Sequence, residues 1–254
     1  MALATLIFDV DGTLADTERD GHRVAFNRAF ADAGLDWHWD VDLYGQLLEV
    51  TGGKERMRYY IEKFRPDYPV TPGFGALVAR LHAAKTDYYT DLLAQGSIPL
   101  RTGVRRLLLA AREAGLKLAI ATTTTPANVT ALLEHALDPQ APSWFEIIAA
   151  GDVVPRKKPA PDIYLYALEQ MRVSARECLA FEDSQNGLQS ARAAGLETVI
   201  TVNDYTRDHD FDGAALVVDS LGEPQQPFSV IRADNRVNGA HMFDLALARR
   251  LLSN

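Results

Sequence analysis

Two carboxylates stand close together directly after the first apolar segment of the chain. In the stretch LIFDVDGTLADTE, residues 6–18, Asp9 and Asp11 follow three apolar residues, and Gly12 and Thr13 come next. No basic residue lies near enough in the sequence to pair with both acids. A polar turn would account for one aspartate. Two of them indicate a site that holds a cation and performs chemistry on oxygen atoms.

Three more polar clusters stand at the ends of apolar runs. Threonines occupy residues 122–125 after KLAIA, the basic segment PRKKPAPD (155–162) follows FEIIAAG, and CLAFED ends in Glu182 and Asp183 before Ser184. In an open parallel sheet, ligands bind beyond the carboxyl ends of the strands. We therefore expect these side chains to converge at one edge. Hard oxygen ligands suit Mg²⁺, and ammonium and hydroxyl groups bind phosphoryl oxygens, so the set predicts a site for Mg²⁺ and a phosphate.

The elements that position these side chains follow a repeating pattern. None of the apolar runs alternates cleanly with polar residues, which is typical of strands buried on both faces in a parallel sheet. Helical patterns lie between them, with prolines at their starts and Gly115 and Gly195 at their ends. The expected strands are 5–10, 117–122, 145–151, 178–183, 197–202 and 215–219, and the expected helices are 103–115, 126–137, 161–171 and 184–195.

The segment 16–98 breaks this alternation. It contains helical patterns over 17–33, 40–50, 54–64 and 75–95 and no convincing strand. We predict an α/β fold with a doubly wound, Rossmann-like parallel-sheet core, residues 1–15 and 99–254, and an inserted all-α cap domain, residues 16–98. Within the core, residues 222–239 are expected to form a loop. An amphipathic helix over 240–252 should dock behind it.

Composition excludes several classes of function. The net charge of −8 over 254 residues argues against a nucleic-acid partner, although a few local cations could still bind an anionic substrate. No apolar stretch approaches the roughly 18 residues of a membrane span, so no membrane partner is expected. The single cysteine, Cys178, is predicted to be a buried core residue and permits no internal disulfide. With no targeting segment recognised, we expect a cytoplasmic monomer.

The ordered motifs resemble those of a known superfamily. The segments DVDGT, the threonine run, KKPAPDIY and FEDSQNG are similar to the four motifs of the haloacid dehalogenase superfamily, in the same order and over almost the whole chain. The helical insert resembles the cap of the β-phosphoglucomutase-like branch. Within that branch, ADTERDGHRVAFNRAF and TGGKERM are similar to the CbbY type, which resembles xylulose-1,5-bisphosphate phosphatases.

The resemblance implies a role for each core motif. Asp9 would attack phosphorus and form an aspartyl-phosphate, and Asp11 would shuttle protons to the leaving oxygen and from water. Thr122 and Lys158 would bind the transferring phosphoryl group. The metal ligands would come from Asp9, the carbonyl of Asp11, Asp183 and Glu182.

Simpler interpretations exist for several of these residues. Asp9 and Asp11 could form a turn and a cap, although the other three motifs argue against this. Thr123 and Thr124 could belong partly to a turn, and Thr125 is better explained as a helix N-cap before Pro126. Other residues with such an interpretation are Arg156, as a solvated charge, and Asp162, Ser184 and Asn186, as helix-start residues.

The cap is expected to select the substrate. Gly52 and Gly53 permit a tight turn beside a ligand, and Lys54 and Arg56 would then face it. Lys85, one turn past His82, matches a lysine that reaches the second phosphate in the related mutases. Ordinary exposed helix positions are the alternative for these cations. The full expected substrate-binding set is Glu18, His22, Thr51, Gly52, Gly53, Lys54, Arg56, Lys85, Thr122, Thr123, Thr124 and Lys157, with Glu18 and His22 on sugar hydroxyls.

The function expected from these residues is a Mg²⁺-dependent sugar-phosphate phosphatase. Cap cations suit a sugar bisphosphate, whose second charge lies far from the reacting phosphate, and by resemblance a pentulose 1,5-bisphosphate. A phosphomutase or a phosphoglycolate-type phosphatase is the alternative. A non-catalytic sugar-phosphate binder needs no acid–base carboxylate, and a dehalogenase needs neither the second aspartate nor a metal. One departure is Thr102, where relatives usually have proline, and we expect it to loosen the hinge of the cap slightly.

Overall fold

A seven-stranded sheet forms the centre of the core. The computed structural model describes residues 3–96 and 98–253. The strand order is β3-β2-β1-β4-β5-β6-β7, and every neighbouring pair is parallel except β6 with β7. The strands are β1 (Thr5–Phe8), β2 (Lys117–Thr122), β3 (Ile147–Ala150), β4 (Cys178–Glu182), β5 (Glu197–Thr201), β6 (Leu216–Val218) and β7 (Val230–Ala233). Because β1 lies between β2 and β4, the segments that follow these three strands emerge side by side.

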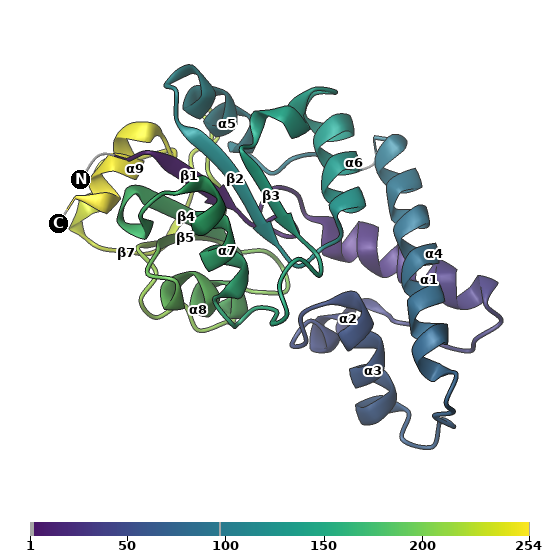
Figure 1. Ribbon diagram of the computed structural model, residues 1–254. Helices are drawn as coiled ribbons and strands as arrows, with labels where there is room; N and C mark the ends of the chain where they lie inside the picture. Colours follow the sequence, from purple (N-terminus) through teal and green to yellow (C-terminus); the bar gives the residue numbers. More distant parts are fainter. Residues whose placement is uncertain (1–2, 97, 254) are drawn as a thin grey trace.

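Helices cover both faces of the sheet (Figure 1). Alternate residues of β1 point to opposite faces: Leu6 and Phe8 join one hydrophobic cluster with α5, α6 and α9, and Ile7 joins another with α7 and α8. The helices are α5 (Val104–Glu113), α6 (Pro126–Ala136), α7 (Asp162–Met171), α8 (Gln185–Ala193) and α9 (Leu245–Leu252). This arrangement confirms the predicted α/β fold class, and Cys178 is buried in the core as expected.

The cap is a helical unit with its own hydrophobic core. A single π-helical turn, Glu18–His22, leads into α1 (Arg23–Asp32), and α2 (Val41–Leu47), α3 (Gly53–Phe64) and α4 (Phe74–Ala94) follow. Phe26, Phe30, Trp37 and Trp39 pack together at its centre. The cap extends away from the carboxyl ends of the strands, with α4 lying beside α6 (Figure 1).

Arg101 ties the returning crossing to the core. Ala15 and Leu100 form an antiparallel bridge where the two crossings meet. The Arg101 guanidinium donates to the carbonyls of Thr201 (3.0 Å) and Asp219 (2.9 Å) at the ends of β5 and β6. It also lies 3.3 Å from the Asp16 carboxylate on the outgoing crossing. These contacts fix the position of the crossing at Leu100 and Arg101. The next residue, Thr102, is also bound to the core, because its carbonyl accepts from Leu221 N (3.1 Å).

The C-terminal segment differs from the sequence-based expectation. The predicted loop over 222–239 is wrong in part, because it contains β7, which pairs antiparallel with β6, and a 3₁₀ turn at Asn235–Val237. All four side chains of β7 are exposed, including those of Val230 and Ile231. The run of four residues is too short for its apolar residues to show the period of a strand. The final helix begins at Leu245 rather than at residue 240, capped by the Asp244 side chain.

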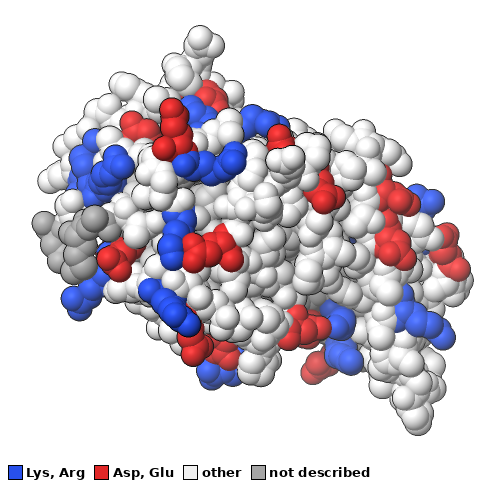
Figure 2. Space-filling model, turned by 45° about the horizontal axis from the view of Figure 1, so that its top comes forward, with Lys and Arg blue, Asp and Glu red and all other residues white. Residues whose placement is uncertain are grey.

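The surface carries charges of both signs. On the face shown in Figure 2, acidic and basic side chains are interspersed and do not form a continuous basic surface of the kind that nucleic-acid-binding proteins present. Within the described parts of the chain, none of the helices is both long enough and apolar enough to span a bilayer.

Candidate active site

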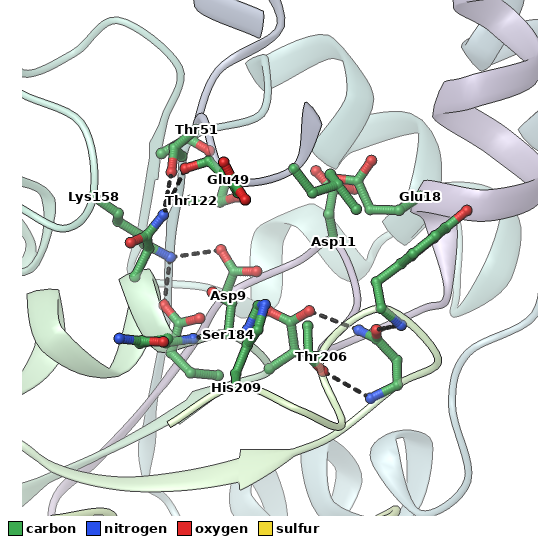
Figure 3. Close-up of a pocket in the computed structure, with 18 of the residues that line it drawn as sticks. Asp9, Asp11, Glu18, Glu49, Thr51, Thr122, Lys158, Ser184, Thr206 and His209 are labelled. Carbon is green, nitrogen blue, oxygen red and sulfur yellow. Dashed lines mark hydrogen bonds and ion pairs between the residues drawn. The ribbon is translucent and has the colours of Figure 1, made fainter. Parts of the chain in front are cut away.

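A cavity of about 390 Å³ lies between the carboxyl ends of the strands and the cap. Core residues line one side of it and cap residues the other (Figure 3). The core contributes Asp9, Asp11, Thr122, Thr123, Lys158, Glu182, Asp183 and Asn203, and the cap side contributes Glu18, Glu49, Thr51 and Arg56. The structure thus brings the four core motifs together, because the segments after β1, β2, β3 and β4 meet at one edge of the sheet.

Asp9 is held in a buried network of charges. Lys158 Nζ lies 2.6 Å from Asp9 Oδ1 and 2.5 Å from Glu182 Oε1 (Figure 3), and the Tyr164 hydroxyl donates to the same Glu182 oxygen at 2.6 Å. Burial raises the pKa of Asp9 to about 7, with Lys158 acting in the opposite direction and Glu182 adding to the rise. Burial alone would lower the pKa of Lys158, but the two carboxylates raise it above its usual range. Lys158 is therefore a fixed positive charge beside the proposed nucleophile.

Three buried carboxylates form a group suited to a hard cation. One oxygen each from Asp9, Glu182 and Asp183 lies within 4.8 Å of the others. Burial raises the pKa of Asp183 well above its usual range, and repulsion from Asp9 and Glu182 adds to this. Glu182 Oε2 is buried without a hydrogen-bond partner among the described residues. A divalent cation would relieve both the repulsion and the unpaired oxygen, so the donor set fits Mg²⁺.

Gly12 makes room for the acidic group. Its φ of +80° lies in the left-handed region that favours glycine. A β-carbon at this position would overlap the Asp183 carboxylate and lie 2.6 Å from Asn203 Nδ2. The same Asn203 amide donates to Asp183 Oδ2 at 2.7 Å. The turn after β1 therefore packs directly against the third acid, which Asn203 holds in place.

Asp11 faces the cap rather than Lys158. Its Oδ1 accepts from the Thr17 hydroxyl (2.5 Å) and lies 2.8 Å from His22 Nε2, and His22 Nδ1 lies 2.8 Å from Lys85 Nζ. Burial would raise the pKa of Asp11, but His22, Thr17 and Lys85 together lower it below its usual range. Asp11 is therefore ionised in this arrangement. His22 and Lys85 are both buried. His22 contacts Asp11 directly, and Lys85 contacts His22, so both influence the main cavity through Asp11.

A second buried cluster on the cap joins Glu18 and Arg56. The Tyr44 hydroxyl donates to Glu18 Oε2 and accepts from Arg56 Nη1 (2.8 Å), while Arg56 Nη1 lies 3.6 Å from the same carboxylate oxygen. Burial, with Glu18 adding to it, raises the pKa of Tyr44 well above its usual range, so the hydroxyl stays a donor. Glu18 and Arg56 both line the main cavity, and Tyr44 behind them fixes their positions.

Lys54 lies apart from Arg56, although only one residue separates them in sequence. Its Nζ pairs with Asp152 Oδ2 at 2.7 Å, and Lys157 Nζ pairs with Asp152 Oδ1 at 2.6 Å. Both lysines line a neighbouring hollow of about 380 Å³, together with Gly52, Gly53 and other residues. Asp152 thus links the cap to the core at the rim of the site.

The remaining predicted residues have separate places. Thr122 and Thr123 line the main cavity, whereas Thr125 caps α6 by accepting from Asn128 N. Asn186 Nδ2 reaches the Glu49 carbonyl (3.3 Å) and Thr51 Oγ1 (3.4 Å) across the boundary between core and cap. Three further residues make local contacts: Ser184 caps α8, and exposed Arg156 pairs with Asp162 at 2.7 Å.

Sequence reasoning missed Asn203, Tyr44, Asp152 and Tyr164. Asn203 follows the fifth strand, so extending the strand-end rule by one strand would have found it. Asp152 closely follows β3, so the same rule would have found it as well. Tyr44 and Tyr164 lie within helices and carry no such signal, because each acts through residues distant in the sequence.

Comparisons with known proteins agree with this geometry. Residues 3–195 match the family model for haloacid dehalogenase-like hydrolases. The chain is 49% identical to the plasmid-encoded protein CbbY of Cupriavidus necator over 225 residues, which are 89% of this chain and 88% of that protein. The crystal structure of CbbY from Rhodobacter sphaeroides in complex with phosphate is 44% identical, with a TM-score of 0.79 over 86% of this chain and 94% of that chain.

A mutant of the same Rhodobacter sphaeroides protein provides a further match. Its crystal structure, in complex with xylulose 1,5-bisphosphate, is 43% identical, with a TM-score of 0.79 and the same coverage of 86% and 94%. The family match spans most of the chain, and the acids, lysine and threonine expected of such enzymes meet in one cavity. The chain therefore belongs to the haloacid dehalogenase-like hydrolases, as a phosphoric monoester hydrolase of the CbbY type.

Proposed function

We propose that this chain is a Mg²⁺-dependent phosphatase that hydrolyses a sugar bisphosphate, most specifically xylulose 1,5-bisphosphate, through an aspartyl-phosphate. One observation carries the proposal. The cavity has a buried Asp9–Lys158 pair and three clustered carboxylates on its core side, and Arg56 with Glu18 on its cap side. A substrate whose reacting phosphate lies at Asp9 and whose other end is polar and anionic, pointing toward the cap, matches these two sides of the cavity.

Asp9 performs the first step. Its carboxylate oxygen attacks phosphorus, the new oxygen–phosphorus bond forms, and the bond from phosphorus to the sugar oxygen breaks. Lys158, 2.6 Å from Asp9, orients the nucleophile and offsets charge on the phosphoryl oxygens. Thr122 contributes a hydroxyl from the end of β2. Asp9, Asp183, Glu182 and the Asp11 carbonyl would hold Mg²⁺, which would supply positive charge to keep Asp9 ionised and to offset the charge of the phosphate.

Asp11 performs both proton transfers. It protonates the leaving sugar oxygen as the first bond breaks, and it then takes a proton from the water that attacks the aspartyl-phosphate. This second attack breaks the bond between Asp9 and phosphorus and releases inorganic phosphate. The contacts from Thr17 and His22 favour the ionised form of Asp11, which the second step requires. The first step requires the protonated form. The proton that Asp11 takes from water in one cycle is the proton that it gives to the leaving sugar oxygen in the next, so the two steps balance.

The cap favours a substrate with a second charged group. Arg56 is a buried cation that lines the main cavity, and buried Lys85 lines the small cavity that adjoins it. Lys54 lies in the neighbouring hollow, where it pairs with Asp152. The complex of the Rhodobacter sphaeroides relative with xylulose 1,5-bisphosphate supports a pentulose bisphosphate in particular. Because one buried cysteine permits no internal disulfide, we place the enzyme in a reducing compartment such as the cytoplasm, where it acts as a monomer.

The test combines a nucleophile variant with a substrate panel. Asp9→Asn is expected to abolish phosphate release from every ester, whereas Asp20→Asn, an exposed carboxylate near the crossing, should leave it unchanged. Chelation of divalent metal should stop turnover, and added Mg²⁺ should restore it. Residual activity of Asp9→Asn at the same site would refute the nucleophile. Conversion of β-glucose 1-phosphate mainly to glucose 6-phosphate, rather than to free phosphate, would refute a phosphatase in favour of a mutase.

A further inference from the structure

A small cavity between α4 and α6 extends beyond the residues that the mechanism uses. Its volume is about 40 Å³, and it adjoins the main cavity, because Asp11, Glu18, Arg56 and Thr123 line both. Beyond these shared residues, the lining includes His82 and Lys85 of the cap and Thr124 and Asn128 of the core. The space is a polar extension of the substrate site toward the interface of cap and core.

Asn128 is buried at this interface with half of its amide unpaired. The side chain is 2% exposed, and Nδ2 donates to Thr124 Oγ1 at 2.8 Å. Among the described residues, Oδ1 has no hydrogen-bond partner. If the amide were turned over, Thr124 would donate to Oδ1 and the NH₂ group would be left unpaired instead. One polar atom of Asn128 is free in either orientation, and a buried polar atom without a partner is costly.

Arg56 offers a second unpaired group in the same cavity. Its Nη1 is engaged by Tyr44, but its Nε is buried without a partner among the described residues. A donor from the cap and an amide from the core therefore line the same small space. A hydroxyl can both accept from Arg56 Nε and donate to Asn128 Oδ1, so it satisfies both atoms.

The donors and acceptors of the cavity select between ligand groups. The Asn128 side chain, with Nδ2 on Thr124, offers its free Oδ1 as an acceptor. A sugar hydroxyl can donate to this oxygen, whereas the oxygens of an ionised phosphate only accept. The surroundings of Asn128 thus match the polyol part of a substrate rather than either of its phosphates.

We propose that Asn128 is a specificity-determining residue that binds a hydroxyl of the sugar, with Arg56 Nε as its partner across the interface. The proposal rests on the sugar-bisphosphate phosphatase function proposed above. In the closed arrangement the hydroxyl bridges α6 of the core to α3 of the cap. A sugar with this hydroxyl therefore completes a polar contact between the cap and the core. A bisphosphate without hydroxyls cannot make this contact.

The test compares two bisphosphates of equal chain length. Xylulose 1,5-bisphosphate carries hydroxyls, whereas pentane-1,5-diol bisphosphate carries the same two phosphates and no free hydroxyl. We expect Asn128→Ala to raise KM for xylulose 1,5-bisphosphate about tenfold or more, because a buried hydrogen bond is lost. The inhibition constant of pentane-1,5-diol bisphosphate should stay within about twofold, because this compound has no hydroxyl to donate to Asn128 Oδ1.

Two further variants guard against a structural explanation. Asn128→Ser retains a hydroxyl and should lie between the wild type and Asn128→Ala, which also keeps the test valid if the alanine variant folds poorly. Asn27→Ala is the matched control, because the Asn27 amide is fully engaged by the backbone of Trp39 at 2.7 and 2.8 Å. It should lower thermal stability without changing the ratio of the two constants.

The outcomes separate the inference from the proposed function. In Asn128→Ala, the KM for xylulose 1,5-bisphosphate could stay unchanged, or it could change in parallel with the inhibition constant of pentane-1,5-diol bisphosphate. Either result would overturn the role of Asn128 and leave the phosphatase function standing. Failure of the unaltered enzyme to hydrolyse any sugar bisphosphate would overturn the proposed function and the inference with it. That second result is read from the wild type alone.

Discussion

At the scale of single residues, charge placement divides the site into two halves. Lys158 acts on Asp9 from the core, and the line of His22 and Lys85 acts on Asp11 from the cap. The two aspartates are two residues apart, yet burial raises the pKa of Asp9, whereas His22, Thr17 and Lys85 together outweigh burial and lower the pKa of Asp11. The environment of each carboxylate, rather than its residue type, therefore assigns its protonation state.

Lys85 is expected to make substrate binding depend on pH. Burial lowers its pKa to about 8, although Asp11 and Glu18 act in the opposite direction, so the ammonium group loses its proton above about pH 8. An exposed lysine would keep its proton to about pH 10.4. We therefore expect KM for a bisphosphate to rise as the pH increases beyond 8, measured over pH 6.5–9.5 in roughly half-unit steps.

The control is the uncharged variant Lys85→Met. It should show a high KM that no longer rises above pH 8, and p-nitrophenyl phosphate, which lacks a distal charge, should show no such rise in either protein. A KM that rises equally for both esters in the wild type would contradict the assignment to Lys85.

Tyr44 is expected to act as a positioning residue for the cap side of the site. Tyr44→Phe removes the hydroxyl that links Glu18 to Arg56. KM for the sugar bisphosphate should rise several-fold while kcat for p-nitrophenyl phosphate is kept. The free energy of unfolding should fall by about 1–2 kcal/mol, measured by urea titration. Tyr60→Phe, in the same aromatic core, is the control, and an equal rise in KM there would argue against a specific role for Tyr44.

At the scale of elements, each catalytic side chain depends on how one strand ends. The turn after β1 brings Gly12 against Asp183 at the end of β4, and Asn203 after β5 holds the same acid. The cis peptide between Lys158 and Pro159 lies in the segment that carries Lys158 back over β1. These ends form one surface because β1 is flanked by β2 and β4 in a parallel sheet.

Two glycines with similar backbone angles provide a test of this packing. Gly12 (φ +80°) is enclosed by Asp183 and Asn203, whereas a β-carbon added to Gly34 (φ +71°), at the end of α1, would meet no described atom within 4 Å. Gly12→Ala should lower kcat/KM by about 100-fold or more and weaken Mg²⁺ binding, because Asp183 is displaced. Gly34→Ala should cost only the backbone strain of about 1–2 kcal/mol and keep full activity. Comparable activity in the two variants, measured with a Mg²⁺ titration, would show that Gly12 has no special steric role.

At the scale of the whole molecule, the cap and the core meet around the main cavity. Asp152 joins Lys54 of the cap to Lys157 of the core on one side of the cavity, and Asn186 reaches the Glu49 carbonyl on the other. Arg101 anchors the hinge between them. Such contacts across a boundary favour the closed arrangement, in which water is expelled from the site.

Asp152→Asn is expected to loosen this closure. Lys157 and Lys54, which lower the pKa of Asp152 to about 2, would be left without their shared carboxylate and would repel each other. Because the pair is exposed, the effect should be modest: faster hydrogen exchange at the crossings near residues 14–18 and 98–102, and a rise of a few-fold in KM. Asp36→Asn, which breaks an exposed ion pair with Arg65 inside the cap, should change neither. If hydrogen exchange at the crossings were the same in Asp152→Asn as in the wild type, the ion pairs of Asp152 would not hold the cap against the core.

Apolar runs and helix-capping residues in the sequence predicted most of the fold. Buried apolar runs, capping threonine and serine, and glycines after helices are local signals, and they predicted six of the strands and all the helices of the core within a few residues. The edge strand β7 was missed although it contains the strand formers Val230 and Ile231, because it is only four residues long and lies in a segment rich in turn-forming residues. The π-helical turn at Glu18–His22 was likewise hidden within a longer helical pattern.

The sequence by itself determined which chemistry is available: Asp9, Asp11, Thr122, Lys158 and Asp183 follow their strands, and parallel pairing brings strand ends together. Only the tertiary structure decided which cap cations face the cavity. Lys54 and Arg56 are neighbours on α3, yet Lys54 pairs with Asp152, 98 residues away, while Arg56 turns inward to Tyr44 and Glu18. The physical reason is that the sequence pattern of a helix shows only which residues share a face. The packing of the cap on the core decides which face points into the cavity.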